Sequence, residues 1–353
     1  KKNKKKILKK ISIFLDEGTF IGGKDVQRFE KNISNLCKTK FCVGTNSGTD
    51  ALTLGMHLMG IKRGDEVITP ANSFIASTAA IIHLGAIPVF ADVGDDLNID
   101  PKDIENKITK KTKAIMPVHL TGRVAKMKEI LEIAKKNKLE IIEDAAQSIG
   151  SKYYDKMSGS FGKIACFSAH PLKNLNAIGD SGYLTTNDKN IFLKSKLLIN
   201  HGIEKNNKVS HFGFVSRMDS FQALILNYRL KKLKKTILTR RQNANTYNLE
   251  LKNFVEVPVD KSYEYNTYHT YIIKSDKRNL LQKHLLKDGI ETKINYRIPI
   301  HLQKAAKELN YKKGSLPKTE KLSKQILTLP INQHLSEKDL FRIISSIKNF
   351  FKK

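Results

Sequence analysis

The chain has 353 residues, of which 40% are hydrophobic and 27% are charged. This composition is typical of a globular protein with one large domain plus a smaller one, or two ordinary domains, and it excludes collagen-like and disordered chains. The formal net charge of +29 comes mostly from scattered lysines without interleaved aromatic residues. We therefore expect a solvated, lysine-rich surface with no nucleic-acid or membrane partner, and keep a polyanion-binding module as an alternative.

Cysteine content and the ends of the chain bear on location. The three cysteines, Cys37, Cys42 and Cys166, are too few and too unevenly spaced for a disulfide framework or a zinc site. We therefore expect a cytoplasmic protein without a metal.

The lysine-rich start has no apolar signal core, and the missing initiator Met leads us to expect that the chain begins inside a longer protein. The uncharged stretch 67–91 contains prolines and polar residues, so it predicts strands and a helix instead of a membrane span.

Apolar runs alternate with helical patterns over the first two thirds of the chain. The helices are expected near 49–59, 73–84, 101–108 and 125–137, between strands at 66–69, 88–92, 113–117, 139–143 and 164–168. Strands that are apolar on both faces and separated by helices predict an α/β fold, with a mainly parallel sheet and helices on both faces. Ligands of such sheets bind at the carboxyl ends of the strands.

The last third has a different pattern. Residues 219–252 read as helical, a strand is expected at 268–274, and helices follow near 277–288, 317–326 and 336–350. We interpret this part as a smaller C-terminal α+β domain. The predicted domains are 1–235, a large α/β domain with an N-terminal arm, and 236–353.

An anion site is predicted where Asn46-Ser-Gly-Thr-Asp50 opens a helix. The first backbone N–H groups of a helix and the positive end of its dipole attract anions, and Gly48 would let a phosphate approach closely. An ordinary capped helix is the alternative for this segment.

A carboxylate is expected at the end of the strand at 139–143. Asp144 follows that strand, and Gln147 lies three residues further on, so one helical turn would bring both side chains to one face. A buried carboxylate needs a cationic or hydrogen-bonding partner, for which a protonated heterocyclic nitrogen would serve. A simple helix N-cap is the alternative.

Two further side chains follow strands. Lys173 lies in a loop among Pro171, Leu172, Leu175 and Ile178, and apolar surroundings lower a lysine pKa and make the amine nucleophilic toward an aldehyde. Phe74 follows the strand at 66–69, where its ring could stack on a flat ligand. A solvated lysine and a core aromatic ring are the alternatives. Taken together, an anion cradle, a carboxylate, a reactive lysine and a stacking ring indicate pyridoxal phosphate.

The sequence resembles the sugar aminotransferases of the DegT/DnrJ/EryC1/StrS family, which have the aspartate aminotransferase fold (fold type I). The resemblance runs from about Phe14 to the C-terminus. Its ordered matches are Thr19–Gly23, Asn46–Leu52, Gly64–Ile68, Gly85–Phe90, Asn98–Pro101, Val118–Leu120, Glu143–Gln147, the Lys173 segment, Ser216–Arg217 with Gln222–Ala223, and Pro299–Gln303.

The resemblance implies a role for each matching residue. Lys173 would hold pyridoxal 5'-phosphate covalently and later move the proton between the substrate carbon and the cofactor. Asp144 would pair with the pyridine nitrogen, Gln147 would bond the phenolic oxygen, and Phe74 would stack on the ring. The phosphate would be held by Gly48, Thr49, Asp50 and Ser168.

The family pattern also implies a homodimer with shared active sites. Arg217 matches a position that reaches the cofactor phosphate of the neighbouring subunit, and Tyr296 and His301 match a segment near the substrate. Three positions depart from the pattern: Val215 where Asn is common, Ser181 where Gly is usual, and Asn295 where His is common. The first bears on contacts with the partner subunit, and the others bear on the choice of substrate.

The expected reaction moves an amino group from L-glutamate to a keto carbon of a nucleotide-linked deoxysugar, for polysaccharide or amino-sugar biosynthesis. The segment 173–180 resembles members that act at C3 more than those that act at C4. A sugar dehydratase is one alternative, although such relatives typically have His in place of the reactive lysine. A non-catalytic regulatory relative is another.

Overall fold

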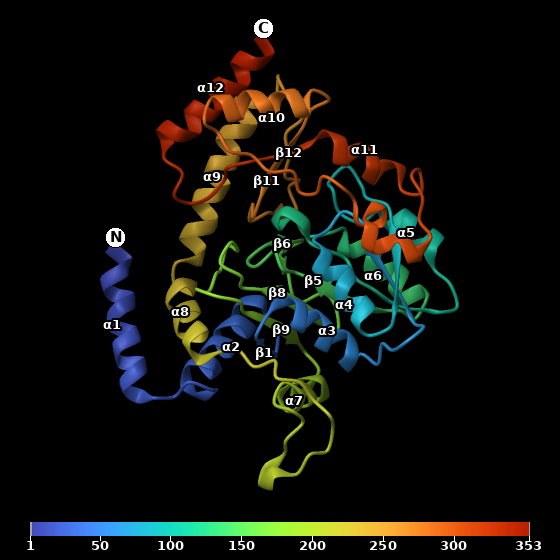
Figure 1. Cartoon of the computed structure of the whole chain (residues 1–353), viewed down its shortest axis with the longest axis vertical. Helices are drawn as coiled ribbons and strands as arrows, with labels where there is room; N and C mark the ends of the chain where they lie inside the picture. Colours follow the sequence, from blue (N-terminus) through green and yellow to red (C-terminus); the bar gives the residue numbers. More distant parts are fainter. Residues whose placement is uncertain (1, 353) are drawn as a thin grey trace.

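A seven-stranded sheet forms the centre of the computed structural model, which describes residues 2–352. The strand order is β1-β9-β8-β5-β4-β2-β3. Figure 1 labels β1, β9, β8 and β5 of this sheet. β9 is antiparallel to both of its neighbours, and the other strands run in one direction. The strands are β1 (Phe41–Thr45), β2 (Glu66–Pro70), β3 (Ile87–Ala91), β4 (Thr112–Ile115), β5 (Glu140–Asp144), β8 (Ile164–Ser168) and β9 (Gly182–Thr186). The prediction of a mainly parallel sheet is confirmed.

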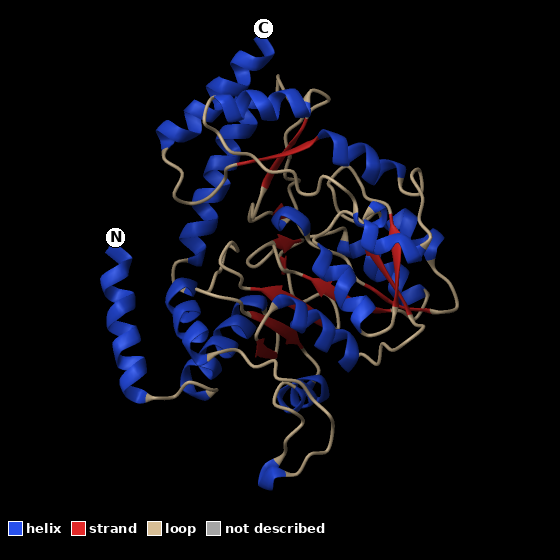
Figure 2. Ribbon diagram, viewed as in Figure 1, coloured by secondary structure: helices blue, strands red, loops and turns tan. Residues whose placement is uncertain are grey.

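Helices cover both faces of this sheet (Figure 2). Alternate residues of one strand point to opposite faces, and Cys166 and Phe167 of β8 accordingly belong to different core clusters. One face packs on α3 (Gly48–Leu58), α4 (Ile75–His83) and α7 (Lys189–Leu198). The other packs on α2 (Gly23–Cys37), α5 (Pro101–Lys107), α6 (Met127–Lys136) and α8 (Ser220–Leu230).

A second core lies in the C-terminal third. The antiparallel pair β11 (Tyr271–Lys274) and β12 (Ile326–Leu329) packs with α9 (Leu233–Leu251), α10 (Arg278–Lys287) and α12 (Glu337–Lys352). The helix α9 belongs to both cores, because Ile237 packs under the main sheet and Tyr247 packs in the C-terminal cluster. The domain boundary at 235/236 therefore falls inside a continuous helix and stays a prediction.

The remaining elements are shorter or peripheral. They are α1 (Lys2–Glu17), α11 (Pro317–Gln325) and the strands β6 (Lys152–Tyr153), β7 (Lys156–Met157) and β10 (Glu264–Tyr265). Short 3-10 helices lie at Leu120–Gly122, Lys205–Asn207, Ile300–Leu302 and Lys304–Leu309. The uncharged stretch 67–91 forms most of β2, then α4, then β3, as expected. Within residues 2–352, no helix has both the length and the apolar character needed to cross a membrane.

The carboxyl edge of the sheet gathers the loops that carry the predicted site. β1, β2, β5 and β8 all end at this edge because they run in the same direction, and the antiparallel β9 begins there. The register pairs Thr45 with Gly182 and Ser168 with Gly182, so the loops after β1 and β8 lie on either side of the start of β9.

Candidate active site

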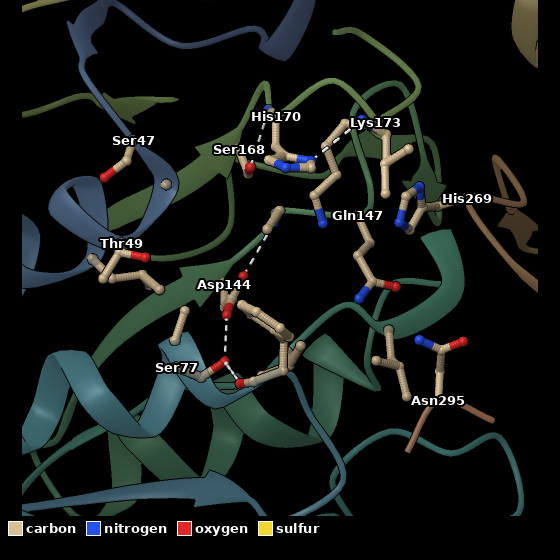
Figure 3. A pocket seen from close by; sticks show the side chains of 18 of the residues that line it. Ser47, Thr49, Ser77, Asp144, Gln147, Ser168, His170, Lys173, His269 and Asn295 are labelled. Atoms are coloured by element: carbon tan, nitrogen blue, oxygen red, sulfur yellow. Dashed lines mark hydrogen bonds between the residues drawn. The ribbon is translucent and has the colours of Figure 1, made fainter. Parts of the chain in front are cut away.

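A cavity of about 490 Å³ lies at this edge of the sheet (Figure 3). The C-terminal third contributes part of its wall, with His269, Thr270, Ile272, Asn295 and Tyr296. Most of the residues predicted from the sequence line it: Gly48, Thr49, Phe74, Asp144, Gln147, Ser168, Lys173 and Tyr296. The fold thus brings together groups that are separated by more than two hundred positions in the chain.

The start of α3 forms one end of the cavity. Ser47 caps the helix, with its hydroxyl accepting a hydrogen bond from the Asp50 amide at 3.0 Å and its carbonyl accepting one from the Ala51 amide at 3.1 Å. Because the Asp50 and Ala51 amides already bond Ser47, the N–H groups of Gly48 and Thr49 are the ones at the helix start that can bind a ligand. The hydroxyl of Ser168 lies across from them at the end of β8.

Asp144 is only 5% exposed and is held by two donors. Its Oδ2 accepts a hydrogen bond from the Ser77 hydroxyl at 2.7 Å, and its Oδ1 accepts one from the Ala146 amide at 3.1 Å (Figure 3). Ser77 comes from α4 and was not anticipated from the sequence. Its position beside Asp144 depends on how α4 packs, and this packing has no local sequence signature.

Glu143 anchors the same strand end from the opposite face. Its carboxylate accepts hydrogen bonds from the amides of Gly159, Phe161 and Gly162, at 2.7–2.9 Å. The Nδ1 atom of the buried His119 accepts a hydrogen bond from the Ala125 amide. The other ring nitrogen, Nε2, therefore carries the hydrogen and donates it to Glu143 across 3.0 Å. These bonds fix the strand end from which Asp144 projects.

Gln147 lines the cavity, but the backbone that carries it is not helical as expected. Residues 145–150 form turns instead of a helical turn, so the expectation of helical spacing between Asp144 and Gln147 was wrong. Both side chains nevertheless line the cavity. The Gln147 Oε1 accepts a hydrogen bond from the Thr121 amide at 2.8 Å, so the side-chain NH₂ is the donating end. One N–H of this group meets the Tyr296 hydroxyl, and the other is the one to offer a ligand.

Lys173 lies in the loop after β8, on the wall of the cavity near His170 and His269 (Figure 3). The loop is fixed by hydrogen bonds from the Asn174 side chain to the Thr267 carbonyl at 3.1 Å and from the Ala177 amide to the Ala169 carbonyl at 2.7 Å. Burial lowers the pKa of Lys173 below its ordinary value, and the negative charge of Asp144 partly opposes this. A lysine with a lowered pKa has more of its amine in the neutral, nucleophilic form.

His269 is a second cavity residue that the sequence analysis missed. It lies inside the predicted strand at 268–274, but the observed strand begins only at Tyr271. The buried guanidinium of Arg240 donates to the carbonyls of Tyr268 and His269 at 3.0 and 3.1 Å and so fixes this segment. Burial, with the nearby charge of Lys173, moves the pKa of His269 well below its ordinary value.

Comparison with known proteins identifies the family. The chain matches the model of the DegT/DnrJ/EryC1/StrS aminotransferase family over residues 1–348. The chain belongs to this family. The predictions of the family, of the aminotransferase class and of the fold are therefore confirmed.

Three relatives of this aminotransferase cover nearly its whole length. One is the dTDP-3-amino-3,6-dideoxy-alpha-D-galactopyranose transaminase of Aneurinibacillus thermoaerophilus, which is 38% identical over 98% of this chain and 95% of the relative. The dTDP-3-amino-3,4,6-trideoxy-alpha-D-glucose transaminase of Streptomyces venezuelae is 35% identical over 96% of this chain and 90% of the relative. A pleiotropic regulatory protein of Geobacillus stearothermophilus is 37% identical over 99% and 95%.

Solved structures share the fold of the aminotransferase. DesV of S. venezuelae superposes with a TM-score of 0.96 at 34% identity, over 99% of this chain and 95% of that chain. NtdA of Bacillus subtilis, with bound cofactor PMP, superposes with a TM-score of 0.92 at 33% identity, over 98% of this chain and 81% of that chain. The prediction of the cofactor is confirmed, because PLP and PMP forms occur among the solved aminotransferase structures that share this fold.

The cavity of the aminotransferase fits this cofactor. A Cβ atom on residue 48 would come within 2.8 Å of the Ser168 Cβ, so glycine is the residue that lets the helix start pack directly on the end of β8, with its amides close to Ser168. Among the side chains that the structure describes, no cationic one is in hydrogen-bond contact with the buried carboxylate of Asp144, and a protonated ring nitrogen would supply the missing positive charge. Phe74 is 57% exposed, which leaves its ring free to cover a flat ligand.

Three predicted site residues do not line the cavity of their own chain. The carboxylate of Asp50 accepts a hydrogen bond from Ser216 at 2.7 Å. Arg217 donates to the side chain of Asn200. His301 is buried, with its Nε2 3.1 Å from Glu320. The roles expected for Asp50, Arg217 and His301 stay predictions.

Proposed function

We propose that this chain transfers the amino group of L-glutamate to a keto carbon of a nucleotide-diphospho deoxysugar, with C3 favoured over C4. The observation that carries the proposal is the convergence of Lys173, Asp144 and Gln147 on one cavity. The names of two relatives describe 3-amino sugar transaminases acting on dTDP-linked sugars, which supports both the substrate class and the preference for C3.

Each residue has a task that its surroundings suit. When bound, pyridoxal phosphate supplies an aldehyde that takes up amino groups and a ring that withdraws electrons from the substrate carbon. Lys173 would bind and release that aldehyde. Its Nζ would also carry the proton between the substrate carbon and the cofactor. Asp144 would balance the positive charge of the ring nitrogen, and the Gln147 NH₂ would donate to the phenolic oxygen.

The phosphate would be held by neutral donors of this chain and by a cation from a second copy. The Gly48 and Thr49 amides and the Ser168 hydroxyl supply the neutral donors. We propose that Arg217 of the partner subunit supplies the charge, because its planar guanidinium meets two phosphate oxygens at once. The active form would then be a homodimer.

An exposed hairpin supports the homodimer. The segment 200–215 extends away from the body of the molecule below α7 (Figure 1), and it is closed by bridges between Asn200 and Val215 and between Ile203 and Val209. It exposes 99% of Phe212, 42% of Phe214 and 58% of Val215. Apolar side chains gathered on a surface segment in this way are typical of an interface between proteins.

The aminotransferase assay tests the proposal directly. The purified protein is incubated with pyridoxal phosphate, L-glutamate and either a 3-keto or a 4-keto nucleotide-linked deoxysugar, and NMR locates the carbon that bears nitrogen. We expect the 3-amino product, and none with Lys173→Ala. Exclusive amination at C4 would refute the preference for C3 alone. Absence of amination by the cofactor-loaded protein would favour a regulatory role, which the name of the Geobacillus relative also suggests.

A further inference from the structure

Ser77 is a buried hydroxyl whose bonding partner is the carboxylate of Asp144. The side chain of Ser77 is 1% exposed, and its Oγ lies 2.7 Å from Asp144 Oδ2 and 3.3 Å from the Phe74 carbonyl. A serine hydroxyl has one proton to give, and the carboxylate oxygen is both the nearer and the stronger acceptor. The Phe74 carbonyl also receives the backbone N–H of Ser77 at 3.3 Å. We therefore infer that the Ser77 hydroxyl donates its one hydrogen bond to Asp144.

The two donors to Asp144 come from different parts of the fold. Ser77 lies in the first turn of α4, after β2, and Ala146 lies in the turn after β5. Each donor holds a different oxygen, so together they fix the rotation of the carboxylate plane. Without the Ser77 hydroxyl, the carboxylate would be held by one oxygen only.

We propose that Ser77 is a positioning residue that orients the Asp144 carboxylate toward the ring nitrogen of the cofactor and thereby strengthens cofactor binding. This inference rests on the proposed pairing of Asp144 with that nitrogen. Ser77 acts only through Asp144, so its effect vanishes when the carboxylate is replaced.

The next residue offers a matched control. Thr78 lies in the same turn of α4 and is 4% exposed, and its Oγ1 has no hydrogen-bond partner in the part of the chain that the structure describes. Thr78→Val removes a buried hydroxyl of similar environment without changing the bonds to Asp144. It therefore separates the loss of this particular hydrogen bond from the general effect of altering α4.

The experiment measures the dissociation constant of pyridoxamine phosphate for the apoprotein by absorbance or fluorescence titration. This form of the cofactor lacks the aldehyde, so Lys173 cannot mask a weakened ring contact by a covalent bond. We expect Ser77→Ala to raise the dissociation constant by about tenfold, since hydrogen bonds to charged groups are among the stronger ones. Thr78→Val should change it by less than about twofold, and Ser77→Thr, which keeps the hydroxyl, should restore it.

A double-mutant cycle with Asp144→Asn gives the decisive comparison. We expect Asp144→Asn to weaken binding and Ser77→Ala to add nothing in that background. If Asp144→Asn weakens binding but Ser77→Ala does not, or if Thr78→Val is as damaging as Ser77→Ala, the role of Ser77 is refuted while the cofactor site stands. If Asp144→Asn itself has no effect, the pairing of Asp144 fails, and this inference fails with it. Should Ser77→Ala not fold, Ser77→Cys, with a weaker donor, replaces it in the same cycle.

Discussion

Gly48 and Ser168 lie so close together that a Cβ atom on residue 48 would be 2.8 Å from the Cβ of Ser168 and 3.1 Å from its Cα. The two residues belong to the start of α3 and the end of β8, which the sheet places side by side through β9. This contact sets the width of the proposed phosphate cradle. It also explains why the helix begins with glycine although the backbone there needs no left-handed conformation.

The width of the cradle predicts the effect of Gly48→Ala. The added methyl group would push the helix start away from Ser168, and overpacking of this kind costs about 1–3 kcal/mol. Expressed on cofactor binding, this cost is about 5- to 150-fold in affinity. Titration of the apoprotein with pyridoxamine phosphate measures the loss, and thermal unfolding of the apoprotein checks that the fold persists. Unchanged affinity in a folded variant would show that the phosphate does not bind here.

Lys173 is expected to hold the cofactor covalently. Reduction of the cofactor-loaded protein with borohydride should leave a pyridoxyl mass on the peptide that contains Lys173, as read by mass spectrometry. Lys173→Ala should abolish transamination and leave the fold intact, because a covalent catalyst contributes far more to rate than to packing. Lys235→Ala, at an exposed position of α9, is the matched control and should behave like the wild type. Label on any other lysine would contradict the assignment.

The pH at which Lys173 becomes reactive should be low for a lysine. Burial lowers its pKa from 10.5 and the charge of Asp144 raises it, so the neutral amine should appear at a pH below 10.5. Asp144→Asn removes the opposing charge and should lower that pH further. Labelling of the apoprotein with acetic anhydride over a range of pH, followed by mass spectrometry of the Lys173 peptide, gives the midpoint. A midpoint at or above 10.5, or an upward shift in the variant, would refute this reasoning.

Arg217 is expected to serve the site of the partner subunit. Lys173→Ala and Arg217→Ala subunits should each be nearly inactive. After subunit exchange, each mixed dimer would have one site with both lesions and one intact site, so up to about half of the wild-type activity per mixed dimer should return, by two-fold symmetry. Mixing two batches of Lys173→Ala protein is the control. If exchange is verified by mass and no activity returns, Arg217 does not act in trans.

The β-strands show which parts of the sheet the sequence predicts and why. The buried strands β2, β3, β4, β5 and β8 are short apolar runs between helical patterns, and each was expected close to its observed position. β1 and β9 were not expected. The side chains of Thr185 and Thr186 in β9 look polar in isolation, but they are buried because their hydroxyls donate to the carbonyls of Gly159 and Lys163, at 2.7 and 2.8 Å. These partners are known only once the chain has folded.

The residues of the site also divide into those that the sequence predicts and those that only the folded structure identifies. Lys173, Asp144 and Phe74 are predictable because each follows an expected strand, and Gly48 is predictable because it opens an expected helix. The family resemblance also marks all four. Ser77 and His269 carry no such mark, since a serine in a helix and a histidine before a strand are ordinary until packing brings them to the cavity wall. In the tertiary structure, His301 lies in hydrogen-bond contact with Glu320 and Asp50 accepts a hydrogen bond from Ser216, so neither side chain lines the cavity of its own chain. Local sequence therefore determined which chemistry the chain carries, and long-range packing decided which polar groups surround it, because hydrogen-bond partners distant in sequence meet only in the folded chain.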